Sequence, residues 1–186
     1  MQPVFPNSPL HRILILGPSG SGKSTLGKRI GKILGIQTVH LDMHFWNPGW
    51  VETPKDEWHD KVKKLIASET WVMDGNYTST LQMRADVADT IIFLDTTRRV
   101  SYLRVVVRYL TNRGKTRPDV TEGCPEKIDM DFIRWIWSYP GTRKPTILKF
   151  LEKQRESKNV YILYNQREIE EFLEALRIRY GLNDRI

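Results

Sequence analysis

The glycine-rich turn within residues 12–25 constrains this chain more than any other stretch. It reads Arg-Ile-Leu-Ile-Leu-Gly-Pro-Ser-Gly-Ser-Gly-Lys-Ser-Thr, with an apolar run before the glycines and a helical pattern after them. The spacing Gly17-x-x-x-x-Gly22-Lys23-Ser24, in this strand–turn–helix context, is that of a P-loop, which binds nucleotide phosphates. The sequence therefore predicts an α/β protein that binds ATP at this turn.

Each residue type in the turn has a chemical reason. Glycines allow positive φ and a close approach to phosphate oxygens, so that successive N–H groups form an anion nest at a helix N-terminus. We expect Lys23 to reach the β- and γ-phosphates as a point charge, and the Ser24 hydroxyl to coordinate Mg²⁺. The predicted nucleotide-binding residues are Gly17, Pro18, Ser19, Gly20, Ser21, Gly22, Lys23, Ser24 and Thr25.

The composition favours one domain over residues 1–186, because 40% of the residues are hydrophobic and the length suffices for one core. Within it we expect an extended tail at 1–9, an acceptor-side region at 42–68 and a lid region at 104–143. No apolar stretch reaches the roughly 18 residues of a membrane span, so no membrane partner is expected. A single cysteine, Cys124, excludes an internal disulfide and a cysteine-clustered zinc site. Together with the lack of a signal-peptide pattern, it fits a cytoplasmic, reducing compartment.

Five short apolar runs alternate with helical patterns, which predicts a parallel α/β sheet with right-handed crossovers. The expected strands are 12–16, 38–41, 71–73, 90–94 and 160–163. The expected helices are 23–34, 54–68, 78–86, 98–112, 129–138, 143–157 and 168–180. We expect residues 42–50 to form a loop, residues 113–130 to form a loop or mobile flap, and residues 139–141 to break the helical pattern.

Three aspartates follow expected strands, at the edge of the sheet where ligands of such folds bind. Asp74 is a candidate Mg²⁺ ligand, directly or through water, with a turn or capping role as the alternative. Asp42 is a candidate catalytic residue that accepts a hydrogen bond or the proton of an acceptor hydroxyl, with a turn role as the alternative. Asp95 precedes a helix and is expected to cap it. His40 and His44 lack a metal-ligand pattern, and we expect them to be structural.

Basic residues concentrate in residues 98–158, which hold 15 lysines and arginines against 7 acidic residues. Such an excess suits an anionic partner, either nucleotide phosphates or a polynucleotide. Arg104 and Arg108 share one helical face and are predicted to be catalytic cations that close over the transferring phosphoryl group. Further candidates for this role are Arg113, Arg117, Arg134 and Arg143, and weak surface ion pairs are the alternative for all six arginines.

Two groups of aromatic residues have open interpretations. Those near Asp42 either form the walls of an acceptor pocket or pack the loop; they are Phe45, Trp46 and Trp50. Those after the basic flap either stack on a polynucleotide or pack a helix against the flap; they are Trp135, Trp137 and Tyr139.

Together these motifs resemble the adenylate-kinase-like nucleoside and nucleotide kinases, and more closely the bacterial DNA topology modulation proteins of the FlaR type. The resemblance covers most of residues 12–164. The segments that carry the closer match are Leu41-Asp42-x-x-x-Trp46-x-Pro48-Gly49-Trp50, Trp71-Val72-Met73-Asp74-Gly75-Asn76-Tyr77, Ile91-Ile92-Phe93-Leu94-Asp95 and Trp135-Ile136-Trp137-Ser138-Tyr139-Pro140.

The resemblance implies a three-layer P-loop NTPase fold with a five-stranded parallel sheet of order 2-3-1-4-5, an acceptor region after strand 2 and a helical lid after strand 4. It also implies that Asp74 serves the metal and that Arg104 and Arg108 begin the lid. The chain departs from adenylate kinases at residues 76–78, which read Asn-Tyr-Thr where those enzymes have Phe-Pro-Arg. Arg84 is then the candidate to grip a monophosphate. A hydroxyl acceptor, as in shikimate- or gluconate-kinase-like enzymes, is the other interpretation.

The leading hypothesis is an ATP-dependent, Mg²⁺-requiring kinase that transfers the γ-phosphoryl group to a small hydroxyl- or phosphate-bearing acceptor, such as a nucleoside or nucleotide. Its catalytic residues would be Lys23, Asp42, Arg104 and Arg108, and its metal ligands Ser24 and Asp74. The alternative is a nucleotide-regulated protein that binds DNA and modulates its topology without small-molecule kinase activity. The two hypotheses differ in where the arginines lie. In a kinase the lid arginines should converge on the P-loop, whereas in a DNA-binding protein they should form a continuous stripe on the surface.

Overall fold

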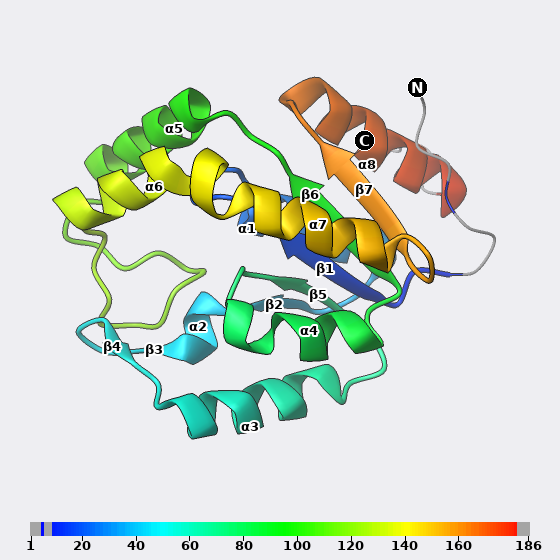
Figure 1. Ribbon diagram of the computed structural model, residues 1–186, viewed down its shortest axis with the longest axis horizontal. Helices are drawn as coiled ribbons and strands as arrows, with labels where there is room; N and C mark the ends of the chain where they lie inside the picture. The colour runs from blue at the N-terminus through cyan, green and yellow to red at the C-terminus, as the bar shows by residue number, and fades with distance from the viewer. Residues whose placement is uncertain (1–4, 6–8, 182–186) are drawn as a thin grey trace.

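Five parallel strands form one sheet in the computed structural model, which describes Phe5 and residues 9–181 (Figure 1). Their order across the sheet is β2-β5-β1-β6-β7, and every neighbouring pair is parallel. The strands are β1 (Arg12–Leu16), β2 (Thr38–His40), β5 (Trp71–Asp74), β6 (Thr90–Leu94) and β7 (Asn159–Leu163). Numbered along the chain, these strands have the order 2-3-1-4-5, so the predicted topology is confirmed.

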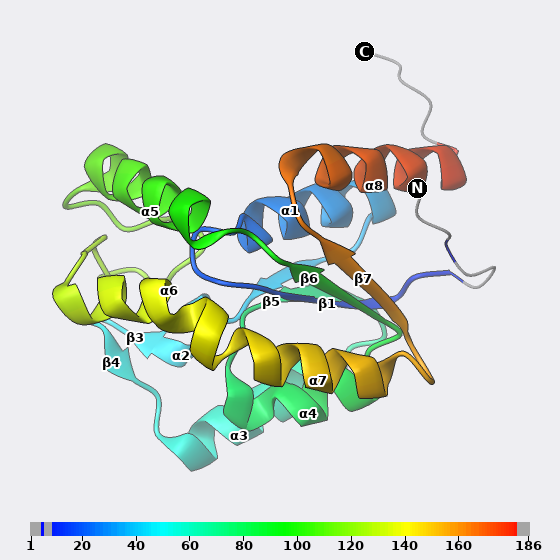
Figure 2. The ribbon, with the colours of Figure 1, turned by 45° about the horizontal axis from the view of Figure 1, so that its top comes forward.

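Helices cover both faces of the sheet, as Figures 1 and 2 show. One face carries α1 (Lys23–Leu34) and α8 (Gln166–Arg179). The other carries α3 (Lys55–Ile66), α4 (Thr78–Val87), the end of α6 (Met130–Thr142), and α7 (Lys144–Gln154). Successive side chains of a strand point to opposite faces, so Ile13 and Ile15 of β1 join the core beside α1, whereas Leu14 and Leu16 join the core beside α3. The predicted three-layer arrangement is therefore confirmed.

Residues 42–50, predicted to form a loop, contain a one-turn helix and most of a small hairpin. These are α2 (Asp42–Phe45) and the antiparallel strands β3 (Trp46–Asn47) and β4 (Val51–Glu52). The hairpin is tied back by Thr53, whose hydroxyl donates to Phe45 O at 2.6 Å. The loop prediction was wrong because one helical turn and two-residue strands are too short to leave a period in the sequence.

The predicted helix break at residues 139–141 is also wrong, because α6 continues through Pro140 and ends at Thr142. Pro140 lies in the last turn, where its missing N–H removes a single hydrogen bond. The next turn still closes, since Arg143 N donates to Tyr139 O at 3.0 Å. The direction of the chain therefore changes after α6 ends, between Thr142 and the start of α7.

Of the tail predicted at residues 1–9, only Phe5 and Pro9 are described; the remainder lies outside the described residues. Phe5 packs against Tyr161 and Phe172, with ring centroids 5.6 and 5.2 Å away. Within the described part of the chain, no helix combines the length and the apolar character that a membrane span requires.

Helix α5 (Arg98–Asn112) lies against the backbone of the P-loop. Its inner side is formed by Ser101 and Val105, whereas Leu103 and Leu110 on its outer side are 61% and 68% exposed. A Cβ added to Gly20 would lie 2.5 Å from Ser101 O, so a side chain at that position would force the helix away. The position of α5 is therefore set by close contact with the P-loop rather than by burial of its apolar side.

Replacing Gly20 with alanine should destabilise the protein more than the same replacement at Gly35. Both glycines have left-handed φ, 75° and 68°, but a Cβ at Gly35 meets nothing within 4 Å. We expect Gly35→Ala to cost about 1 kcal/mol of unfolding free energy from backbone strain, and Gly20→Ala a further 1–3 kcal/mol, roughly, from overpacking. Urea denaturation measures both losses. Equal losses would contradict a close contact between α5 and the P-loop.

Candidate active site

The P-loop connects β1 to α1 at the carboxyl edge of the sheet (Figure 1). Gly17, Gly20 and Gly22 have φ values of 147°, 75° and 98°. Backbone of this kind presents successive N–H groups to an anion in front of a helix N-terminus. Lys23 Nζ donates to Pro18 O at 2.9 Å, which holds the ammonium group over the turn. The loop thus has the conformation that suits phosphate oxygens.

A side-chain amide fixes the first peptide of the P-loop. Asn76, two residues beyond β5, donates from Nδ2 to Gly17 O at 2.9 Å and accepts from Gly17 N through Oδ1 at 3.1 Å. Both polar groups of one glycine are therefore satisfied by a single side chain. This role is not visible in the sequence, where Asn76 stands out only as a departure from the Phe-Pro-Arg pattern.

Arg84 is not available to grip a phosphate, which corrects the suggestion that it replaces the missing arginine of adenylate kinases. Its side chain is fully buried. Its guanidinium donates to Gly75 O at 2.9 Å, Asn76 O at 2.8 Å, Tyr77 O at 2.9 Å and Thr80 O at 3.3 Å. Burial lowers the pKa of this group. Arg84 therefore serves as an internal scaffold for the turn that carries Asn76.

Asp74 ends β5 and lies buried beside the P-loop helix. Its Oδ2 atom lies 2.6 Å from Nδ1 of His40, which is also buried. The histidine holds the carboxylate of Asp74 at the carboxyl edge of the sheet. Asp95 does not cap α5 as predicted, because its carboxylate instead forms an ion pair with Lys144 at 2.8 Å.

Asp42 begins α2, and its Oδ1 atom accepts a hydrogen bond from the Tyr77 hydroxyl at 2.6 Å. Burial raises the pKa of Asp42, and the Tyr77 hydrogen bond and the Lys23 charge offset this in part, so that the net shift is upward. A carboxylate with a raised pKa is a better proton acceptor than an ordinary one. The tyrosine fixes the orientation of the group.

The aromatic residues near Asp42 pack mainly on one another. Phe45 has its ring centroid 4.6 Å from that of Tyr77 and 5.1 Å from that of Trp58, and the rings of Trp46 and Trp50 are 5.3 Å apart. Most of these pairs are edge-to-face or tilted, the favourable arrangement for aromatic side chains. This packing gives α2 and the β3–β4 hairpin a rigid base.

The segment between α5 and α6, residues 113–129, crosses over to the α2–hairpin region, and we call it the lid segment (Figure 1). The Thr121 hydroxyl donates to Trp46 O at 2.6 Å, and Met43 O lies 2.9 Å from the same hydroxyl oxygen. Gly49 N donates to Gly123 O at 2.9 Å. Trp50 Nε1 donates to Pro125 O at 2.9 Å. The lid segment is therefore docked on the β3–β4 hairpin and on α2, the helix that begins with Asp42.

Charged residues on the inner side of the lid segment form a network around Glu126, which is 6% exposed. Arg108 donates to Glu126 Oε1 through two nitrogens at 2.9 and 3.1 Å, and Arg117 pairs with the other carboxylate oxygen. Arg117 also pairs with Asp119 at 2.8 Å. One buried carboxylate thus fixes two arginine side chains, Arg108 by charge-assisted hydrogen bonds to one oxygen and Arg117 by an ion pair with the other.

These groups converge on Lys23. Burial lowers the pKa of its ammonium group, the carboxylates of Asp74 and Asp42 raise it, and the guanidinium groups of Arg108 and Arg117 lower it, so that the net shift is downward. All five residues were predicted from the sequence, Lys23, Asp42, Asp74 and Arg108 as site residues and Arg117 as a further lid candidate. The structure brings all five together at one edge of the sheet.

Arg104 lies apart from this group, on the other side of the P-loop. It donates to Ser21 O at 3.1 Å and to Gln166 Oε1 at 3.3 Å. It lines a cavity of about 260 Å³ with Gly22, Thr25 and other residues from the start of α1 and α8. The structure therefore separates the two arginines that the sequence predicted to act together.

The remaining basic candidates lie outside the network. Arg134 pairs with the exposed Asp131, which is the weak surface ion pair named as its alternative. Arg113 is exposed, and Arg143 lies over the ring of Trp135 with 5.7 Å to its centroid. Arg143 and Trp135 line a second, largely apolar cavity of about 350 Å³ between α4, α6 and α7, which also reaches Asn76.

No family model matches the sequence, and no curated protein matches it significantly. Solved structures do match the fold. A shikimate kinase from Acinetobacter baumannii, in complex with shikimate, has a TM-score of 0.60 at 17% identity, covering 92% of this chain and 94% of its own. A shikimate kinase from Bacteroides thetaiotaomicron has a TM-score of 0.53 at 18% identity, covering 94% and 100%. A gluconokinase from Sinorhizobium meliloti has a TM-score of 0.52 at 18% identity, covering 92% and 94%. The likeness extends over nearly the whole chain and establishes the P-loop NTPase fold.

Replacing Arg84 with glutamine should destabilise the protein strongly. The change removes the guanidinium donors of the buried Gly75 O and of the partly buried Asn76 O and Tyr77 O, and each loss of a donor to a buried oxygen costs about 1–3 kcal/mol. We expect a loss of about 3 kcal/mol or more in the free energy of unfolding, measured by chemical denaturation. Arg99→Gln is the matched control, because Arg99 is exposed on α5 and its loss should change stability by less than about 0.5 kcal/mol. Similar small losses for both variants would contradict the scaffold role.

Proposed function

We propose that this protein is an ATP-dependent kinase that transfers the γ-phosphoryl group to the hydroxyl of a small molecule. One observation carries the proposal: Arg108 and Arg117, fixed by Glu126, lie close enough to the P-loop lysine to lower its pKa, and Asp42, whose own pKa is raised by burial, lies close to the same lysine. Phosphoryl transfer needs this combination, because charge develops on the transferring group while the attacking hydroxyl loses its proton. The fold shared with shikimate kinases and a gluconokinase supports the same class of reaction.

The donor half of the site is the P-loop. Its nest of N–H groups and Lys23 suit the phosphates, and the 260 Å³ cavity beside Gly22 and Thr25 suits the nucleoside part of ATP. Arg104 lines that cavity, where its planar guanidinium can stack on a base. We therefore assign Arg104 to nucleotide binding and Arg108, with Lys23, to stabilisation of the transferring group.

A Mg²⁺ ion fits the oxygen donors beside the P-loop. The Asp74 carboxylate lies close enough to Lys23 to raise the pKa of its ammonium group, and Ser24 is the next residue of the P-loop. Mg²⁺ prefers oxygen ligands, one or two of them carboxylates. Ser24 and Asp74 are the residues we propose to hold it, Asp74 directly or through water. When bound, the ion would neutralise charge on the phosphates.

The acceptor half of the site is proposed to lie between Asp42 and the lid segment. Asp42 would take a hydrogen bond, and then the proton, from the attacking hydroxyl, with Tyr77 fixing its orientation. The 350 Å³ cavity adjoins the same Asn76-Tyr77 turn and offers the Trp135 ring and the Arg143 guanidinium. These groups suit a small acceptor with a flat or an anionic part.

The DNA-binding alternative is not favoured by the placement of the basic residues. Arg104, Arg108 and Arg117 bond to the P-loop or to a buried carboxylate, so they do not form an outward stripe. A backbone-tracking surface would leave such side chains free to meet phosphates in solvent.

A phosphoryl-acceptor screen tests the proposal. Protein, Mg²⁺ and γ-labelled ATP are incubated with nucleosides, nucleotides, hydroxy acids and sugar acids, and label transfer is measured. Lys23→Ala should lower transfer by about a thousandfold, because it removes the cation nearest the phosphates. Lys28→Ala, at an exposed position on the same helix, should leave it unchanged. Transfer to no acceptor, together with DNA affinity that falls steeply with salt, would favour the alternative.

The two arginines of α5 should give different kinetic changes. Arg108→Ala should lower kcat by about a hundredfold with the affinity for ATP changed by less than about threefold, because it acts on the developing charge. Arg104→Ala should raise the KM for ATP about tenfold with little change in kcat, because it removes a wall of the nucleoside cavity. Steady-state kinetics and equilibrium ATP binding measure both. If both variants weakened ATP binding and left kcat unchanged, Arg104 and Arg108 would both be assigned to nucleotide binding alone.

A further inference from the structure

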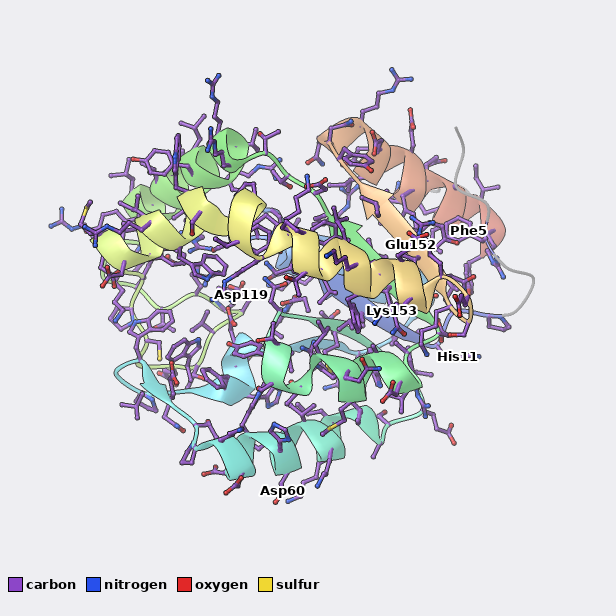
Figure 3. All side chains as sticks on the ribbon, viewed as in Figure 1. Phe5, His11, Asp60, Asp119, Glu152 and Lys153 are labelled. Carbon is purple, nitrogen blue, oxygen red and sulfur yellow. The ribbon has the colours of Figure 1, made fainter. Side chains whose placement is uncertain are left out.

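A carboxylate of the lid segment lies near the hydroxyl of the P-loop serine. Asp119 is close enough to Ser24 for that hydroxyl to lower the pKa of its carboxyl group, and it forms an ion pair with Arg117 at 2.8 Å. Figure 3 shows Asp119 at the inner edge of the lid segment, facing the middle of the molecule. Asp119 comes from a segment without a sequence period, so the motifs alone do not indicate it.

Asp119 is an anion beside a loop built to bind anions. Its carboxylate forms an ion pair with Arg117 at 2.8 Å, and only 12% of its side chain is exposed. A bare carboxylate at this position would repel ATP phosphates. A cation between the carboxylate and the phosphates removes that repulsion and turns it into attraction.

The lid segment does not need Asp119 in order to stay docked. Thr121 and Gly123 bond to the α2–hairpin region, and Trp50 bonds to Pro125, all independently of Asp119. Arg117 likewise keeps Glu126 as a partner if Asp119 is lost. The lid segment and Arg117 therefore keep their other contacts without Asp119, as expected for a side chain whose role is to bind a ligand rather than to hold the fold.

On the P-loop side we propose one hydroxyl, of Ser24, and one carboxylate, of Asp74, as metal ligands. Within the described residues, Asp119 included, no three histidine, cysteine or carboxylate side chains are grouped as a metal site. Mg²⁺ bound to nucleotides takes one or two carboxylates, and phosphates and water supply the remainder. A second carboxylate delivered by the lid segment fits that number.

We propose that Asp119 is a Mg²⁺ ligand, directly or through water, that the lid segment contributes to the Ser24 side of the ATP site. This inference rests on the proposed function, because it takes Mg²⁺ and ATP as the occupants. Its consequence is that metal binding and closure of the lid segment favour one another, since the metal site is complete only when both are present.

The test compares the affinity of a non-hydrolysable ATP analogue with Mg²⁺ and with a chelator instead of Mg²⁺. In the natural protein Mg²⁺ should tighten binding. In Asp119→Asn this enhancement should fall by about tenfold or more, while binding in chelator is kept or tightened. Electron paramagnetic resonance of Mn²⁺, used in place of Mg²⁺, should show correspondingly weaker metal binding in the ternary complex.

Glu122→Gln is the matched control, because it removes one negative charge from an exposed position on the same lid segment and should behave as the natural protein. The inference would be overturned if Mg²⁺ tightened analogue binding in Asp119→Asn as much as in the natural protein while binding in chelator also became tighter. Asp119 would then only compete with nucleotide phosphates for the P-loop. Loss of binding in chelator as well would overturn it in favour of a structural role. Failure of the natural protein to bind the analogue under either condition would instead refute the proposed function itself.

Discussion

The rest of the structure depends on how closely the P-loop backbone approaches its neighbours. A Cβ on Gly17 would lie 2.7 Å from Leu94 O, and one on Gly20 would lie 2.5 Å from Ser101 O, so β6 and α5 are positioned directly by glycine backbone. On the other side the Asn76 amide holds Gly17 through both of its polar groups. Arg84, buried beneath, holds the turn that carries Asn76. The phosphate-binding loop is thereby fixed before any ligand arrives.

Charge is arranged around this fixed loop in two layers. The inner layer comes from the sheet and α2, where Asp74 is held by His40 and Asp42 is held by Tyr77. The outer layer comes from α5 and the lid segment, where Glu126 orients Arg108 and Arg117. Because each charged group has a partner that fixes it, the site needs little reorganisation, which is the condition for strong electrostatic stabilisation of a transition state.

The parts of the fold that could be predicted are those with a local signal. The P-loop follows from glycine spacing, and the sheet order follows from apolar runs together with a family resemblance. The buried role of Arg84 could not be predicted, because its partners are carbonyl oxygens whose positions depend on the folded turn. The position of Asp119 near Ser24 could not be predicted either, since the lid segment has no period and Ser24 is distant in the chain. Asp42 and Arg108 were found from strand ends and helical spacing, although their meeting depends on tertiary structure.

Hydrogen–deuterium exchange tests the central claim most directly, namely that the lid segment and the P-loop form one ATP site. The measurement compares amide protection in residues 17–25 and 113–129, with and without Mg²⁺ and a non-hydrolysable ATP analogue. The account predicts that both segments gain protection together. Protection of residues 17–25 with no change in residues 113–129 would contradict it, because the lid segment would then take no part in binding ATP.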